Sequence, residues 1–239
     1  MKKIIVRWNV GKTTKEGFDC LKYSIKKFKH LYKDYNIEYF ICFNDIEKEK
    51  FSDFKDMNLI NKKDFTKSLP IDPPKKTGLP AWKLYPPRLD KDSHEIIIDN
   101  DLILFKKPEI IEEFFKSDDL IITTESLKRS YSGKLKDVIP NNFNINTGLI
   151  CLPPKFDFKK KIIDCINEFN LDWKNHFDEQ TCLAYIFSKH KNLSIIKLTD
   201  IYVCHADYKN SNCGFHFAGV NDGNKNYWEY FLLKTKFYI

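Results

Sequence analysis

Long hydrophobic runs are missing from this sequence. No stretch approaches the roughly 18 apolar residues that a membrane-spanning helix needs. Residues 1–7 place two lysines before an apolar run of three residues, which is too short for the core of a signal peptide. We therefore expect a cytoplasmic protein.

The chain also lacks internal repeats and low-complexity linkers. A repeat of about 20 to 50 residues would indicate a solenoid or a propeller, and a linker would indicate separate domains. The 239 residues are 42% hydrophobic and 15% aromatic, which is enough for a substantial core and too apolar for a disordered segment. We predict a single domain over residues 1–239.

Neither a disulfide framework nor a basic nucleic-acid-binding surface is indicated. Lysine and arginine (40) outnumber aspartate and glutamate (33), for a net charge of +7, but the lysines are spread along the chain. We expect no nucleic-acid partner. The cysteines are odd in number, scattered and embedded in apolar runs, which indicates buried thiols in a reducing compartment. They are Cys20, Cys42, Cys151, Cys165, Cys182, Cys204 and Cys213.

The sequence does contain an alternation of β-branched runs and helical periodicity. Residues 4–8 predict a first strand, and apolar residues then recur at three- and four-residue steps from Phe18 to Leu31. This alternation is typical of an α/β fold with a mostly parallel central sheet flanked by helices. Further strands are expected at 38–43, 57–60, 96–98, 120–124, 146–152, 193–198 and 201–204, and further helices at 108–115, 158–169 and 178–188.

Proline is concentrated in one part of the chain. Six of the ten prolines lie between Thr66 and Asp92. Proline lacks a backbone donor and restricts the residue before it, so a long regular element is excluded there. We expect an irregular segment that faces the substrate and holds a short helix at 81–85.

An acidic triplet follows the most apolar strand. Residues 96–98 are three isoleucines that run directly into Asp99, Asn100 and Asp101, and another apolar run follows at 102–105. Open α/β sheets bind ligands outside the carboxyl ends of their strands, where this triplet is expected. Two carboxylates at this spacing can converge on one hard cation, which bridges the phosphates of a nucleotide-sugar. We predict that Asp99 and Asp101 bind Mn²⁺ or Mg²⁺.

The stretch 96–104 resembles the metal-binding segment of glycosyltransferases with the GT-A, or nucleotide-diphospho-sugar transferase, fold. The nearest similarity is to the glycosyltransferase family 8 type. The resemblance implies a single-domain GT-A fold in which the part up to about residue 105 binds the nucleotide and the remainder binds the sugar and the acceptor. It also implies that Asp99 and Asn100 contact the donor.

In that group a basic residue on a short helix before the acidic motif approaches the donor. Lys83, in the run Ala-Trp-Lys-Leu at 81–84, stands at the matching place. The resemblance therefore implies that Lys83 binds the donor, with Arg88 as the alternative.

The run 144–150 resembles the Asn-x-Gly strand that lies beside the transferred sugar in this superfamily. It implies that Asn146 and Gly148 contact the donor. An amide both donates and accepts hydrogen bonds, as sugar hydroxyls require, and a glycine lets the backbone come close.

The run 177–183 is similar to the segment that opens a helix near the sugar and the acceptor. This similarity implies catalytic roles for Asp178, Glu179 and Gln180. Two of these side chains are carboxylates, and either Asp178 or Glu179 would be the base if the reaction inverts the sugar.

The run 216–219, His-Phe-Ala-Gly, resembles the segment whose histidine completes the metal site. It implies that His216 is the third metal ligand and that Gly219 contacts the donor. A neutral imidazole suits Mn²⁺ beside two carboxylates. The family 8 pattern continues to a Lys-Pro-Trp that this chain lacks, and Lys225 is the residue that would take over its contact with the diphosphate.

Three other patterns in the sequence bear on these assignments. His205 is an alternative to His216 as the metal ligand. Cys204, His205, Cys213 and His216 offer a donor set for structural zinc, although their spacing matches no common finger. The run 11–13, Gly-Lys-Thr, lacks the upstream glycine of a phosphate-binding loop, so a P-loop ATPase is excluded.

The resemblance predicts a hexosyltransferase-like enzyme that moves a sugar from a nucleotide-diphosphate donor, a UDP-sugar before others, to a hydroxyl of a carbohydrate, glycoprotein or glycolipid. The alternative is a non-catalytic carbohydrate- or nucleotide-binding module of the same fold. The missing Lys-Pro-Trp favours this alternative, and the presence of both acids, Asp99 and Asp101, argues against it. The run 227–239 mixes aromatic residues with lysines. It is expected either to pack onto the domain as a last element or to dock peripherally on a membrane.

Overall fold

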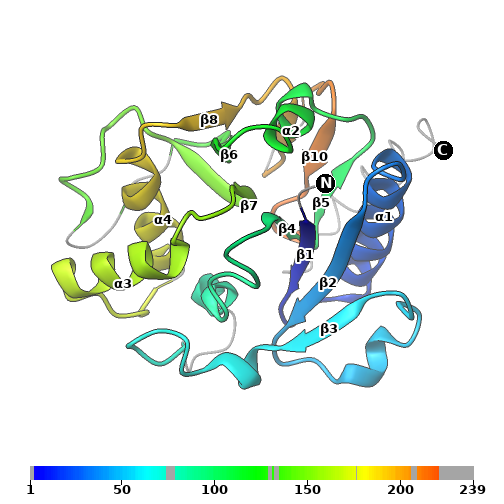
Figure 1. Cartoon of the computed structure of the whole chain (residues 1–239), viewed down its shortest axis with the longest axis horizontal. Helices are drawn as coiled ribbons and strands as arrows, with labels where there is room; N and C mark the ends of the chain where they lie inside the picture. Colours follow the sequence, from blue (N-terminus) through cyan, green and yellow to red (C-terminus); the bar gives the residue numbers. More distant parts are fainter. Residues whose placement is uncertain are drawn as a thin grey trace.

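The computed structural model describes residues 3–73, 79–128, 131, 135–175, 177–205 and 209–220. A seven-stranded sheet runs through them in the order β3-β2-β1-β4-β7-β6-β8 (Figure 1). Its strand pairs are parallel except those of β7, which is antiparallel to both β4 and β6. The strands are β1 Ile4–Val10, β2 Ile37–Phe43, β3 Asn58–Asn61, β4 His94–Asp99, β6 Leu120–Thr124, β7 Ile145–Leu152 and β8 Leu193–Ile196. The expected mostly parallel sheet is confirmed.

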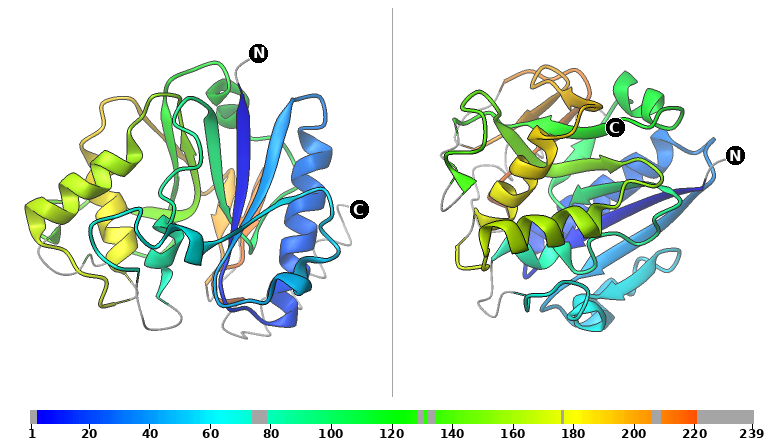
Figure 2. Two further views of the ribbon diagram at one scale, coloured as in Figure 1. Left: turned by 60° about the horizontal axis from the view of Figure 1, so that its bottom comes forward. Right: turned by 60° about the vertical axis from the view of Figure 1, so that its left-hand side comes forward.

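Helices flank this sheet on both faces (Figure 2). One apolar core joins α1 and α2 to β1 and β2, and a second joins α3 and α4 to β6 and β7. Leu21, Ile25 and Phe28 form the buried stripe of α1 at the three- and four-residue steps that the sequence shows. The helices are α1 Lys15–Leu31, α2 Glu109–Phe114, α3 Phe158–Phe169 and α4 Asp178–Ser188.

The central strands β1 and β4 are buried along their whole length. Ile96 and Ile98 belong to the core on the α1 side, whereas Ile97 belongs to the core on the side of α3 and α4. An all-isoleucine run therefore suits β4 because both of its faces are covered. The chain leaves this strand at Asp99, so the acidic triplet begins where the apolar cover ends.

A second, three-stranded sheet runs in the order β5-β10-β9. Its strands are β5 Leu102–Leu104, β9 Ile201–Val203 and β10 Gly214–His216, and α1 packs against β5. A strand at 201–204 was expected, but β5 and β10 were not. Antiparallel pairing sets His216 opposite Leu102, directly after the acidic triplet. A Cβ on Gly214 would lie 2.7 Å from the Ile103 carbonyl oxygen, so this pairing requires a glycine there.

Several smaller expectations can be compared with the structure. The short helix expected at 81–85 is a 3₁₀ helix, Pro80–Leu84. The seven cysteines are all free and buried, as expected. Among the described residues, no helix combines the length and the apolar character needed to cross a bilayer. Lys225 and the run 227–239 lie outside the described residues.

A buried ion pair joins β1, β4 and the proline-rich segment. Arg7 Nε lies 3.1 Å from Glu95 Oε1, and both side chains are almost fully buried. The guanidinium also donates to the carbonyl oxygens of Pro86 at 2.8 Å and Pro87 at 3.0 Å. The other oxygen of Glu95 accepts from the Leu89 backbone at 2.9 Å. These bonds hold residues 86–89 against the sheet, just after the helix that carries Lys83.

We predict that Arg7→Met lowers the free energy of unfolding by about 3–5 kcal/mol, because it leaves the Glu95 carboxylate buried without its nearest cation. Urea unfolding followed by circular dichroism measures this loss. Lys22→Met is the control, because it breaks an exposed ion pair of 2.9 Å with Asp53. The unfolding midpoint of the control should not change, and an equal loss in both variants would contradict a special role for the buried pair.

Candidate active site

A cleft of about 200 Å³ opens at the carboxyl ends of β1, β2 and β4. Polar residues dominate its lining, although the strands beneath it are apolar. One wall comes from the ends of the parallel strands, and the opposite wall comes from β7 and the start of α4. The lining residues are Asn9, Gly11, Lys12, Asn44, Asp45, Pro80, Trp82, Lys83, Asp99, Asn100, Asp101, Asn146, Thr147, Glu179, Gln180, His205, His216, Ala218 and Gly219.

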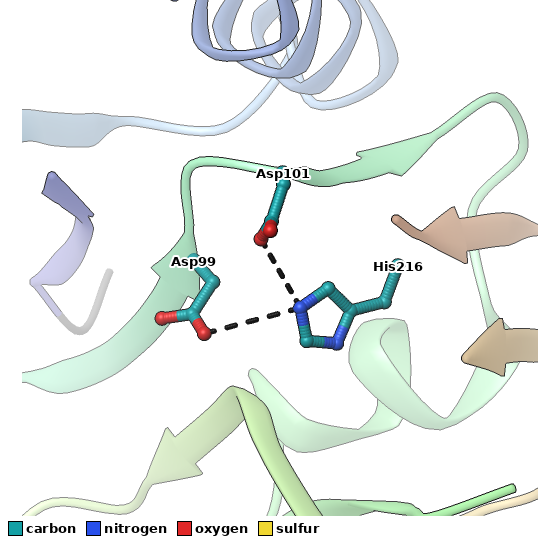
Figure 3. A group of neighbouring side chains, drawn as sticks. All are labelled: Asp99, Asp101 and His216. Atoms are coloured by element: carbon teal, nitrogen blue, oxygen red, sulfur yellow. Dashed lines mark hydrogen bonds and ion pairs between the residues drawn. The ribbon is translucent and has the colours of Figure 1, made fainter. Parts of the chain in front are cut away.

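Asp99, Asp101 and His216 converge in this cleft (Figure 3). His216 Nε2 lies 3.1 Å from Asp101 Oδ1 and 3.9 Å from Asp99 Oδ2. One ligand atom from each residue lies within 4.8 Å of the other two, which makes them the one group of three or more metal-ligating side chains in the described part of the chain. β4 supplies Asp99, the turn after it supplies Asp101, and β10 supplies His216.

The chemistry of this group fits a divalent cation. Asp99 Oδ1 is buried without a hydrogen-bond partner among the described residues, and an unpaired buried carboxylate oxygen is costly. Burial alone would lower the pKa of His216, but the charges of Asp101 and Asp99 outweigh burial and raise it. The two carboxylates thus favour the protonated imidazole, and a bound cation would replace that proton.

Lys83 and Asn100 hold Asp99 and the turn in place. Lys83 Nζ lies 2.6 Å from Asp99 Oδ2. Burial alone would lower the pKa of Lys83, but the carboxylates of Asp99 and Glu179 raise it, so the ammonium is charged. Asn100 lines the cleft and donates to the Gly17 carbonyl oxygen at 3.1 Å, which anchors the turn to α1.

Arg88, the alternative to Lys83, lies elsewhere. Its guanidinium donates to backbone carbonyl oxygens of Asp90 at 2.9 Å and Phe156 at 2.7 Å, among others. It does not line the cleft. Of the two residues, only Lys83 lines the cleft.

A bulge in β7 shapes the opposite wall. Ile122 pairs with Ile150, but the next residue, Thr123, pairs with Asn146, so the residues between 146 and 150 bulge from the ladder. Asn146 Oδ1 accepts from the Gly148 backbone at 2.8 Å and contacts His216 Nδ1 at 2.9 Å. Asn146 lines the cleft, whereas Gly148 lies against the ring of His216.

The three residues expected to be catalytic, Asp178, Glu179 and Gln180, lie at the start of α4, and only two of them face the cleft. Glu179 and Gln180 are buried and line the cleft, and Glu179 Oε2 accepts from Thr147 Oγ1 at 3.4 Å. Asp178 does not line the cleft. Its carboxylate accepts from the backbone of Lys174 and, at 2.8 Å, from that of Asn175, so it closes the loop before the helix. Of the two candidate bases, the geometry favours Glu179.

The pKa of Glu179 is raised above that of an ordinary glutamate. Burial raises its pKa to about 7, while Lys83 and the bond from Thr147 oppose the rise and Asp99 adds to it. Near neutral pH the carboxyl therefore exists in both protonation states. Such a group can donate a hydrogen bond or accept one from a hydroxyl in the cleft.

Several lining residues had no role in the sequence analysis. Asn9 is the next-to-last residue of β1 and Asn44 follows β2, and the Oδ1 atom of each is buried without a hydrogen-bond partner among the described residues. Lys12 adds a positive charge to the same edge. A polar residue at the end of each parallel strand was the signal that would have identified Asn9 and Asn44. Gly219 has a positive φ of 98°, which favours glycine at that position.

Glu125 is a further residue near the site that had no role in the sequence analysis. It follows β6, and its carboxylate contacts His205 Nε2 at 2.7 Å and Asn146 Nδ2 at 3.0 Å. Because the Nε2 atom of His205 faces Glu125, the structure favours His216 as the third member of the metal-ligating group. In the described residues the zinc alternative is not assembled, since Cys204 and Cys213 direct their thiols to backbone carbonyl oxygens of Tyr202 and Lys107.

A scan of protein-family models and a search of curated proteins give no match. Solved structures do match. The galactosyltransferase LgtC, in complex with donor and acceptor sugar analogues, gives a TM-score of 0.58 at 12% identity over 94% of each chain. Mouse xyloside xylosyltransferase 1 in its apo form gives a TM-score of 0.58 at 9% identity over 91% of this chain and 99% of that one. These matches confirm the expected GT-A fold.

We predict that Gly148→Ala weakens Mn²⁺ binding about tenfold, because the added Cβ overpacks the ring of a metal-ligating residue. That Cβ would lie 2.4 Å from His216 Cε1 and 2.5 Å from Nδ1. Calorimetric titration measures the affinity. Gly11→Ala is the matched control, because its Cβ meets only the edge of Trp82 at 3.3 Å. Equal affinities in wild type and Gly148→Ala would show that His216 can move aside.

A second prediction concerns the pH dependence of stability. The folded state raises the pKa of Glu179 from 4.5 to about 7 and thus holds the proton more tightly than the unfolded chain. The contribution of Glu179 to stability therefore falls as pH rises through this window. Relative to Glu179→Gln, the free energy of unfolding of wild type should fall by on the order of 1–3 kcal/mol as the pH rises from 4.5 to about 7. Urea unfolding of both proteins at several pH values tests this, and parallel curves would contradict it.

Proposed function

We propose that this chain of GT-A fold is a metal-dependent glycosyltransferase that moves a sugar from a nucleotide-diphosphate donor to an acceptor hydroxyl. The observation that carries the proposal is the convergence of Asp99, Asp101 and His216 at the carboxyl end of β4. The fold places ligand sites at this edge of the sheet, and the cleft there is lined by the amides, carboxyls and lysines that a charged, hydroxyl-rich donor requires.

Asp99, Asp101 and His216 would hold Mn²⁺ or Mg²⁺. Two carboxylates and an imidazole are suitable ligands for such a cation, and the unpaired Asp99 Oδ1 fits this role. When bound, the cation would neutralise charge on the departing nucleotide diphosphate. These ligands prefer a hard cation, and both Mn²⁺ and Mg²⁺ meet that requirement.

The nucleoside would lie over the ends of β1 and β2. Asn9 and Asn44 offer buried amide oxygens there, which can accept hydrogen bonds from a base or a ribose. Lys12 and Lys83 line the same cleft and would add positive charge along the phosphates. Gly219 lets the backbone come close to the donor.

The transferred sugar would lie against β7 and the start of α4. Thr147, Glu179 and Gln180 line this wall. With a pKa of about 7, Glu179 can bind a sugar hydroxyl as donor or acceptor, and we assign it the catalytic role before Asp178. Gln180 donates from Nε2 to the Ile145 carbonyl oxygen, which fixes its amide at this wall, where it would contact the sugar.

A UDP-sugar is the donor and a carbohydrate, glycoprotein or glycolipid the acceptor in this proposal. The two structural neighbours are named for the transfer of different sugars, galactose and xylose. Support from these neighbours therefore extends to sugar transfer and not to one sugar. A panel of nucleotide-sugars with Mn²⁺ identifies the donor, because an enzyme slowly hydrolyses its donor without an acceptor. Binding without turnover would instead indicate a non-catalytic module.

We predict that Asp99→Asn and Asp101→Asn each reduce turnover at least about a hundredfold, because each removes a charged ligand from the cation that stabilises the leaving group. In wild type, UDP should raise the thermal midpoint only with Mn²⁺ or Mg²⁺ present, since ligand binding stabilises the folded state by mass action. In the variants this metal-dependent shift should disappear.

Asp164→Asn is the control, because it removes an exposed carboxylate that pairs with Lys160 on α3 at 2.8 Å. Its turnover and thermal shift should equal those of wild type. Stabilisation by UDP in excess chelator would show that lysines alone hold the phosphates. Near-wild-type turnover of Asp99→Asn would refute the metal assignment.

A further inference from the structure

A chain of buried hydrogen bonds leads from the metal-ligating group to Glu125. His216 Nδ1 contacts Asn146 Oδ1 at 2.9 Å, and Asn146 Nδ2 donates to Glu125 Oε2 at 3.0 Å. On the other side of the ring, His216 Nε2 lies 3.1 Å from Asp101 Oδ1. The side chain of Glu125 is fully buried and that of His216 nearly so. These hydrogen bonds therefore lie in a buried environment, where each donor must face an acceptor.

The orientation of the Asn146 amide follows from its neighbours. The Gly148 backbone N–H donates to Oδ1 at 2.8 Å, and a backbone N–H can only donate. At the other end, the Glu125 carboxylate accepts from Nδ2 at 3.0 Å. Both contacts require the same assignment, so oxygen faces His216 and nitrogen faces Glu125.

This orientation determines which nitrogen of the imidazole can bind a cation. Because Asn146 Oδ1 is an acceptor, the Nδ1 atom of His216 must carry a hydrogen. Nε2 faces the carboxylates of Asp99 and Asp101, and it is the nitrogen whose lone pair would bind a cation held between them. A metal-binding imidazole needs this arrangement, in which the second nitrogen donates to a fixed acceptor.

Glu125 is itself fixed by groups that can donate to it. Oε1 accepts from the Ser126 backbone at 2.8 Å and contacts His205 Nε2 at 2.7 Å. With Oε1 held by these contacts, Oε2 is the oxygen that faces Asn146. Glu125 does not line the cleft and is separated from the metal-ligating atoms by two side chains.

We propose that Glu125 and Asn146 are positioning residues that set the tautomer and orientation of His216 for a divalent cation. This inference rests on the metal site of the proposed function. It assigns Asn146 a role in preparing the ligand, besides the contact with the donor expected from its sequence. Glu125 acts at a distance, through the amide, and not on the substrate.

Glu125→Gln tests the proposal with little change in shape. The Ser126 N–H keeps an oxygen at the Oε1 position, so the introduced amide nitrogen takes the place of Oε2 and faces the nitrogen of Asn146. Two N–H donors, one from the introduced amide and one from Asn146, would then face each other. Rotation of the Asn146 amide would remove this conflict, but it would place the amide nitrogen against both the Gly148 N–H and His216 Nδ1. Mn²⁺ affinity measured by calorimetry should fall about tenfold to a hundredfold.

The double variant Glu125→Gln with Asn146→Asp restores the pattern. The introduced amide can donate to one oxygen of the introduced carboxylate, while the other oxygen accepts from Gly148 N–H and His216 Nδ1. The net charge is the same as in wild type. Mn²⁺ affinity should return to within about threefold of wild type. A double variant that binds as weakly as Glu125→Gln would overturn the proposal.

Ser126→Ala is the control for local packing, because its hydroxyl bonds to the Val203 carbonyl oxygen at 2.6 Å and reaches Glu125 Oε1 only at 3.4 Å, while its backbone N–H still donates to Glu125. Its thermal midpoint can shift, but its Mn²⁺ affinity should match that of wild type. Unchanged affinity in Glu125→Gln, with the variant folded by circular dichroism, would refute the inference.

Nitrogen NMR of the metal-free protein gives a readout that does not depend on metal binding. With the ring protonated at mildly acidic pH, the Nδ1 hydrogen of His216, which faces Asn146 Oδ1, should exchange slowly with solvent in wild type and in the double variant and faster in Glu125→Gln. Equal exchange rates in all three proteins would refute the inference. Failure of wild type to bind Mn²⁺ would instead refute the proposed function, whatever the exchange rates.

Discussion

Parallel pairing of β1 with β4 is the constraint on which the site depends. In its register Asn9 lies beside Asp99, so two buried strands present polar side chains at the same edge of the sheet. The apolar residues before Asp99 are covered on both faces, and exposing them would sacrifice much of the hydrophobic stabilisation. Asp99 is therefore held where its charge is poorly solvated. Arg7 and Glu95 fasten the same two strands to the segment that follows Lys83.

Sequence reasoning found the features that have a local signal. The carboxylates of Asp99 and Asp101 follow an all-isoleucine run, and this pattern predicted both the strand and its polar end. The choice between His205 and His216 stayed open, because it depends on how β10 pairs with β5. Those strands have three residues each, too few to show a period. Their pairing joins segments that are more than 100 residues apart, which one sequence does not reveal.

Other parts of the site needed three-dimensional information for different reasons. Glu125 follows an ordinary strand, and its partners Asn146 and His205 lie 21 and 80 residues away. Asp178 and Glu179 are equivalent in the sequence, but neighbours on a helix point about 100° apart. One side chain enters the cleft while the other closes the preceding loop. The role of Lys225 stays a prediction, because that residue lies outside the described part of the chain.

The metal-ligating group also closes a very long loop of the chain, since Asp101 and His216 are 115 residues apart. A cation held by both would join the two ends of this loop in the folded protein, and it would stabilise the folded state by mass action. The small sheet that brings these residues together has strands of three residues. Binding of the cation would therefore also stabilise the pairing of these short strands.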